Sequence, residues 1–323
     1  MPAHPRNSRL RRTLLAALVA TSVAAPVSGA ARPAAVPAPV PAELAPLRNA
    51  APGTLDARYA ATRDEIRAAE RMAAGHGDRR RAAALRDMAD PHRRFLLFDG
   101  RDGGRTAEVF GDLAQAERIA VLVPGADTNL DRYWRLRNDS AALRRKLGPK
   151  AAVVAWLGYE TPATVSPAAL TTRRADAAAP GLARFADGLH TARPAARISL
   201  LCHSYGSVVC ARAAPGLRGV AALVLYASPG TGAGNVRALH TRAAVWAGRG
   251  ADDWVARIPH TRLSLPFVSI GFGRDPMSKE FGARTFDAGT GGHSDYLKPG
   301  SLSLRNLARI VSGTAPSGRS RHA

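Results

Sequence analysis

The clearest candidate for a reactive side chain is a serine that stands between an apolar run and a helical pattern. Ser204 stands in the segment Cys-His-Ser-Tyr-Gly. A serine on a sharp strand-to-helix turn projects its hydroxyl above a sheet, and small residues two before and two after it let strand and helix pass closely. Gly206 fills one of these positions, and Cys202 stands where the motif has glycine. The segment predicts a serine nucleophile.

A histidine near the end of the chain could supply the base that a serine needs before it attacks a carbonyl. His293 lies in Gly-Gly-His-Ser-Asp-Tyr, a glycine-rich loop between the last predicted strand and the last predicted helix. His240 and His260 lack such a position after a strand. We therefore predict His293 as the base.

A carboxylate should orient that imidazole and stabilise its charged form. Asp252 and Asp253 follow the predicted strand over 243–247. We favour Asp253, because its Asp-x-Val spacing turns the chain back toward the core, and keep Asp252 as the alternative.

Two backbone N–H groups are candidates to stabilise the oxyanion of a tetrahedral intermediate. One belongs to Tyr205, which directly follows the serine, and the other to Ala126 in the loop Pro-Gly-Ala-Asp-Thr. Gly125 in this loop allows a close approach. The expected chemistry is acyl transfer from an ester to the serine and then to water.

The elements around these residues predict an α/β fold. Apolar runs without polar alternation suit strands buried on both faces of a mostly parallel sheet, and they span 119–123, 152–157, 198–202, 220–227 and 243–247. Helical patterns alternate with them, over 130–147, 167–190, 204–214 and 302–311. A β-hairpin over 94–110 adds an antiparallel edge, a short strand is expected at 284–287, and two helices, over 54–74 and 78–90, precede the sheet.

The chain resembles an actinobacterial α/β-hydrolase family that was long labelled a domain of unknown function. The match covers about residues 93–312 and includes the runs VLVPGADTNLDRYW, AWLGYETP, LLCHSYGSVV, LVLYASPGTG, DDWV, SKEFGA and GGHSDYLKPG. The resemblance implies an α/β-hydrolase fold and a Ser-His-Asp site with Ser204 and His293 in their roles. Family members similar to Gly-Asp-Trp-Ile at this point favour Asp253 over Asp252. The family implies no particular substrate.

The first 30 residues have the order of a secretory signal peptide: four arginines, a short apolar run and then small residues. Arg11-Arg12 also hints at a twin-arginine signal. We expect five regions: a signal peptide (1–30), a Pro/Ala-rich linker (31–46), a helical extension (47–92), the α/β-hydrolase domain (93–313) and a disordered tail (314–323). The mature protein is then secreted or extracytoplasmic.

The two cysteines of the chain, Cys202 and Cys210, are interpreted as small buried residues, because a bridge between them would have to cross the turn at Ser204. No grouping of residues has metal-ligand spacing, and no dinucleotide fingerprint is present, so we expect no cofactor.

The net charge of +21 favours anionic partners such as a cell-envelope surface. No basic stretch is interleaved with aromatics, so nucleic acid is not expected as a partner, and no transmembrane helix is expected in the mature chain. The predicted function is a secreted serine esterase acting on a small-molecule or lipid ester. The alternatives are an acyltransferase to an envelope acceptor and a non-catalytic envelope-binding protein on a hydrolase fold.

Overall fold

The computed structural model describes residues 36–261, 263–264 and 269–316. The predicted signal peptide and the end of the predicted tail lie outside these residues, and the domain boundaries stay predictions. The chain divides after Val36, the one described residue of the first unit, and Pro37–Ala323 form one compact unit.

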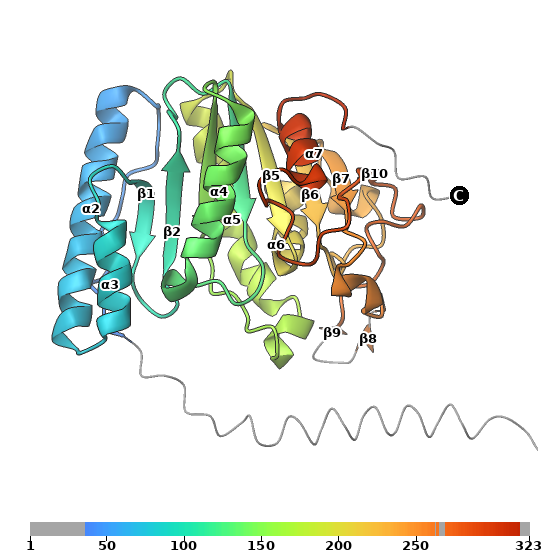
Figure 1. Cartoon of the computed structure of the whole chain (residues 1–323), viewed down its shortest axis with the longest axis horizontal. Coiled ribbons are helices and arrows are strands. Elements are labelled where there is room, and N and C mark those ends of the chain that lie inside the picture. The colour runs from blue at the N-terminus through green and yellow to red at the C-terminus, as the bar shows by residue number, and fades with distance from the viewer. Residues whose placement is uncertain (1–35, 262, 265–268, 317–323) are drawn as a thin grey trace, which may run out of the picture. The chain divides into compact units, whose positions relative to one another are not determined.

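An eight-stranded sheet forms the centre of this unit, in the order β1-β2-β4-β3-β5-β6-β7-β10 (Figure 1). Strands β1 and β2 form the predicted antiparallel hairpin, and β2 pairs antiparallel with β4. The other neighbours are parallel. The strands of the sheet are β1 Arg94–Asp99, β2 Arg105–Phe110, β3 Arg118–Val123, β4 Ala151–Leu157, β5 Arg197–His203, β6 Val220–Tyr226, β7 Ala244–Gly248 and β10 Arg284–Thr285.

Helices cover both faces of the sheet. Helices α5 and α6 contact each other on one face, α4 and α7 contact each other on the opposite face, and α2 and α3 pack beside the β1 edge (Figure 1). The helices are α2 Pro52–Gly75, α3 Arg79–Met88, α4 Trp134–Leu147, α5 Arg173–Ala192, α6 Tyr205–Ala213 and α7 Leu302–Val311. Short 3₁₀ turns are η1 Leu130–Arg132, η2 Pro167–Leu170, η3 Ala214–Gly216, η4 Arg237–Leu239 and η5 Trp254–Arg257.

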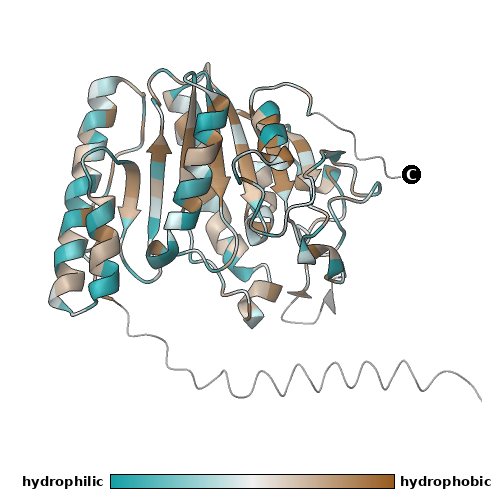
Figure 2. Cartoon of the chain, viewed as in Figure 1, coloured by the Kyte–Doolittle hydropathy of each residue, from teal (hydrophilic) through white to brown (hydrophobic). Residues whose placement is uncertain are grey.

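The hydrophobic pattern of the strands explains this layering. All seven residues of β4 are buried, and the apolar residues of β3 and β5 are buried as well. Figure 2 shows these hydrophobic strands at the centre, with hydrophilic residues on the outward side of α4. Strands without polar alternation are typical of a sheet that is covered on both faces by helices. The predicted α/β-hydrolase fold is therefore confirmed.

Three local expectations need correction. The helix predicted over 130–147 begins as η1 and becomes α-helical only at Trp134. The helix predicted over 167–190 breaks at residues 171–172, where the carbonyl of Thr171 accepts a hydrogen bond from the Tyr205 hydroxyl. Strands β8 Leu263–Ser264 and β9 Ser269–Ile270 form a small antiparallel pair that the sequence pattern did not predict.

Candidate active site

Ser204 lies on the strained turn between β5 and α6. Its backbone has φ 52° and ψ −125°, a positive φ that is rare for any residue except glycine. Such strain is found where a fold holds a functional side chain in one position. A Cβ on Gly206 would lie 2.5 Å from the carbonyl oxygen of Val123, so only glycine lets α6 start this close to the end of β3.

The two cysteines flank this turn and form a disulfide, which corrects their interpretation as separate buried residues. Cys202 on β5 and Cys210 on α6 have Cα atoms 6.4 Å apart. The turn at Ser204 is so sharp that α6 runs back beside β5, which brings its second turn next to the strand. The bridge therefore runs alongside the turn and joins its two arms.

The turn and the glycine-rich loop bring Ser204 and His293 together. His293 Nε2 lies 3.0 Å from Ser204 Oγ, although the two residues are 89 positions apart in the chain. The imidazole is mostly shielded, with 16% of its side chain exposed. The Trp254 ring packs against it at a centroid distance of 4.6 Å.

Asp253 is the aspartate that meets His293. Its Oδ1 lies 2.9 Å from His293 Nδ1, and its side chain is fully buried. Burial alone would raise the pKa of Asp253, but hydrogen bonds from His293, Tyr296 and the Val255 N–H outweigh it and lower that pKa. The carboxylate therefore stays ionised and favours the tautomer with hydrogen on Nδ1, which leaves Nε2 to accept the serine proton. Asp252 is exposed and stays outside the network.

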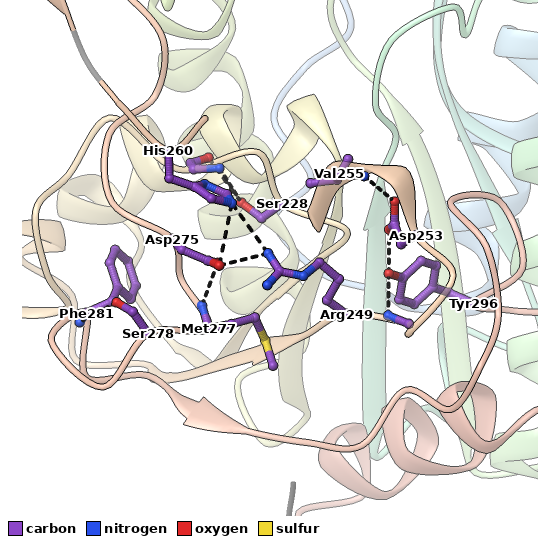
Figure 3. Close-up of polar contacts among 12 residues, drawn as sticks. Ser228, Arg249, Asp253, Val255, His260, Asp275, Met277, Ser278, Phe281 and Tyr296 are labelled. Carbon is purple, nitrogen blue, oxygen red and sulfur yellow. Dashed lines mark hydrogen bonds and ion pairs between the residues drawn. The ribbon is translucent and has the colours of Figure 1, made fainter. Parts of the chain in front are cut away.

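Tyr296 is a site residue that sequence reasoning did not single out. Its hydroxyl donates to Asp253 Oδ2 at 2.6 Å and accepts the Gly250 N–H at 2.8 Å (Figure 3). These two bonds tie the loop that carries the histidine to the loop that carries the aspartate. Its position three residues after His293 is visible in the sequence, but that position alone does not predict a contact with Asp253.

His203 is a second residue without a predicted role. Its Nε2 lies 2.7 Å from the carbonyl oxygen of His293 and, since a carbonyl only accepts, must donate to it. Burial, reinforced by the neighbouring His293, lowers the pKa of His203 to about 4. A neutral His203 thus holds the backbone of the histidine loop at neutral pH.

An ion pair anchors the aspartate loop from the other side. Arg249 pairs with Asp275 at 2.8 Å, and Asp275 also accepts the Met277 N–H at 2.9 Å (Figure 3). His260 lies 3.5 Å from Asp275 and therefore contacts this pair instead of Ser204. His240 is exposed, so neither of the other two histidines joins the candidate site.

The two predicted oxyanion donors lie on either side of Ser204. Neither the Tyr205 N–H nor the Ala126 N–H has a hydrogen-bond partner within the described part of the chain. Gly125 brings the Ala126 loop against the serine, since a Cβ there would lie 2.7 Å from Ser204 Cβ. The Tyr159 hydroxyl holds this loop by donating to the Pro124 carbonyl at 2.7 Å.

A cleft of about 690 Å³ opens beside these groups. The segment 293–299 lines the cleft, together with residues of α4 and Arg132, and His203 and Tyr226 line it as well. The residues 122–128 at the end of β3 complete the lining. The cleft therefore reaches Ala126 and also His293, whose Nε2 lies 3.0 Å from Ser204 Oγ.

Across residues 36–261, 263–264 and 269–316, no cluster of three metal-ligating side chains is present. In the same part of the chain, no helix is both long and apolar enough to cross a bilayer.

Comparisons with known proteins agree with the fold. A family model described as Alpha/beta hydrolase matches residues 99–263. Uncharacterized protein Rv2079 of Mycobacterium tuberculosis is 29% identical over 252 residues, which cover 68% of this chain and 38% of that protein. Uncharacterized protein Mb0988c of Mycobacterium bovis is 33% identical over 167 residues, which cover 46% of this chain and 62% of that protein. The chain thus spans less than two thirds of the length of either relative.

Solved structures also resemble the chain. A Xanthomonas campestris protein, described as a member of a/b serine hydrolase without lid, aligns with a TM-score of 0.43 and 16% identity, covering 69% of this chain and 94% of that one. The esterase LipW from Mycobacterium marinum aligns with a TM-score of 0.43 and 14% identity, covering 82% of this chain and 90% of that one.

Proposed function

Because the chain belongs to the alpha/beta hydrolase family, we propose that it hydrolyses carboxylic esters through an acyl-enzyme formed on Ser204. The observation that carries this proposal is the hydrogen-bonded chain from Ser204 through His293 to Asp253, with distances of 3.0 Å and 2.9 Å. A base within hydrogen-bond reach of the nucleophile, itself oriented by a third group, is the arrangement that activates a serine.

Acylation begins when Ser204 Oγ attacks the ester carbonyl and His293 Nε2 accepts the hydroxyl proton. The carbonyl oxygen becomes an oxyanion, which the N–H groups of Tyr205 and Ala126 stabilise. Asp253 stabilises the positive charge that develops on the imidazole. When the C–O bond breaks, His293 returns the proton to the leaving alkoxide, so the alcohol departs neutral and the acyl group stays on Ser204.

Deacylation repeats these steps with water as the nucleophile. His293 takes a proton from water, the resulting hydroxide adds to the acyl carbon, and the same two N–H groups hold the second oxyanion. The imidazolium then protonates Ser204 Oγ as its bond to carbon breaks. The products are a carboxylic acid and the regenerated serine.

Labelling with a fluorophosphonate probe tests this proposal. The probe should modify the wild-type protein and should not modify Ser204→Ala. A matched control is Ser312→Ala, which removes a serine at the end of α7 and should leave labelling intact. Equal labelling of Ser204→Ala and the wild type would refute the proposal. Failure to label either protein would favour the non-catalytic, envelope-binding alternative.

We further propose that the protein acts outside the cytoplasm. The signal-peptide pattern of residues 1–30 supports export, and so does the Cys202–Cys210 disulfide, since such bonds persist in oxidising compartments. Fractionation of cells that express the full chain tests this. Recovery of the intact chain in the cytosol, with both cysteines reduced, would contradict it.

A further inference from the structure

The basic residues of α4 divide into two groups according to their partners. Arg137 pairs with the buried Glu108 at 3.7 Å, and Arg144 donates to the carbonyl of Gly148 at 2.7 Å. Arg135 and Arg145 line the cleft beside His293, and within the described residues neither is paired with an acid. Arg135 and Arg145 thus line the cleft without an ion-pair partner among the described residues, whereas Arg137, which also lines it, is paired with Glu108.

Other groups in the cleft offset only part of this positive charge. Asp127 lines the cleft, accepts the Thr164 N–H at 3.3 Å and is paired with no cation among the described residues. Arg132, just before α4, also lines the cleft and is paired with no acid among the described residues. Two further lining residues, Lys298 and Asp295, form an ion pair at 2.7 Å. The acid that α4 itself contributes is Asp139, whose pKa burial raises to about 7. This carboxyl is therefore only partly ionised near neutral pH.

An apolar surface accompanies the cations. Trp134 lines the cleft with 57% of its surface exposed, and the Arg135 guanidinium lies over its ring at 5.2 Å from the centroid. Pro299 and the largely buried Leu297 also line the cleft. The cleft can thus hold a short apolar chain and a charged end together, and its volume of about 690 Å³ is typical of small-molecule sites.

We propose that this cleft binds a carboxylate or phosphate group carried by the substrate, so that the protein prefers anionic esters. The inference rests on the proposed esterase function of Ser204 and names its substrate class. Guanidinium groups bind carboxylate and phosphate oxygens through paired N–H donors. Arg132, Arg135 and Arg145 supply these donors, in the same cleft that reaches His293 and Ala126.

A pair of matched esters tests the proposal. 4-Nitrophenyl hydrogen adipate and 4-nitrophenyl hexanoate have acyl chains of equal length and the same leaving group, and differ in a terminal carboxylate. The wild type should show a kcat/KM for the adipate at least about tenfold above that for the hexanoate at low salt. The Arg135→Gln/Arg145→Gln variant should lose this preference through a higher KM for the adipate, and its kcat/KM for the hexanoate should change much less than its kcat/KM for the adipate.

Arg218→Gln is the matched control. Arg218 is exposed and precedes β6, so it lies near the N-terminal ends of the parallel strands, whereas Ser204 follows the C-terminal end of β5. It should keep the preference. Equal kcat/KM for the two esters in the wild type, or a preference that survives loss of both cleft arginines, would overturn the inference.

A binding measurement separates this inference from the esterase proposal. Ser204→Ala should still bind monomethyl adipate or hexyl phosphate in calorimetry, and the ligand that binds identifies the anionic group. The affinity should fall about tenfold when Arg135 and Arg145 are also replaced by Gln. Binding without hydrolysis by the wild type would refute the esterase function and keep the anion site. Hydrolysis without binding of either anion would support the esterase function and refute the anion site.

Discussion

The network around Ser204 and the cleft face of α4 differ in whether their charged groups have partners within the protein. In the network, the carboxylate of Asp253 accepts from His293, Tyr296 and the Val255 N–H, all from within the protein. On the cleft face, Arg135 and Arg145 line an open volume and are paired with no acid in the described part of the chain.

This difference separates two physical tasks. A buried carboxylate that accepts several hydrogen bonds has one position, and catalysis requires reacting groups to be fixed before the substrate arrives. An unpaired cation in a cleft instead keeps its donors available for a ligand, so its strongest interaction comes from outside the chain. The predictions below test each side of this contrast.

The largest effect is expected from neutralising the carboxylate of the network. Asp253→Asn should lower kcat by roughly 10⁴-fold, because the amide no longer holds the imidazole in the tautomer that accepts the serine proton. The neighbouring Asp252→Asn variant should keep kcat within about twofold, since Asp252 is exposed. Ester kinetics of the two variants side by side provide the measurement. A reversed pattern would move the acid to Asp252.

The disulfide should affect stability more than chemistry. A Cys202→Ala/Cys210→Ala variant should lose about 2–3 kcal/mol of unfolding free energy, since the bridge closes a short loop in the unfolded chain. Urea unfolding gives this number, with Ser199→Ala on the same strand as a control for a small buried change. The kcat of the folded double variant should stay near that of the wild type. A large loss of kcat would mean that the bridge itself holds the turn at Ser204.

His203 should make the network sensitive to acid. Its pKa is about 4 in the folded protein and about 6.5 when unfolded. Between these values the unfolded chain binds more protons, so stability falls as pH falls from about 6.5 to 4, by at most about 1.4 kcal/mol per pH unit. In urea unfolding, His203→Gln should show a shallower decline over this range. An unchanged slope would contradict a neutral His203.

The smallest effect is expected on the cleft side, at Asp139. Burial raises the pKa of Asp139 to about 7, and the charge of Arg135 opposes this rise. Asp139→Asn should increase the adipate-over-hexanoate preference two- to threefold at pH 8, where the native carboxyl is ionised and repels an anion. At pH 6 the two proteins should be alike, because the native carboxyl is then mostly neutral. The ratio of two esters at one pH cancels the titration of the catalytic groups.

Much of the candidate site could be predicted because its parts have local signals. The strand-to-helix position of Ser204 and the glycine-rich loop of His293 are both visible as short patterns. Tyr296 and His203 carried no such signal, although both bond to the other members of the network. A tyrosine or a histidine next to a catalytic residue is indistinguishable in sequence from one that points elsewhere.

The disulfide shows the same limit. Along the sequence, the turn at Ser204 separates the two cysteines, which argues against a bridge. In space, that turn reverses the chain so sharply that their Cα atoms are 6.4 Å apart. The distance between two residues on either side of a turn depends on the dihedral angles of the turn. The residue types alone do not predict the φ of 52° at Ser204.

The sequence by itself determined the layered fold and the identity of the serine, because burial and turn formation act on neighbouring residues and leave periodic patterns. It left open the choice between Asp252 and Asp253 and gave no sign that Arg135 and Arg145 share a cleft with His293. Only the tertiary structure decided these points, since adjacent side chains point in different directions and loops distant in sequence must meet before a contact exists.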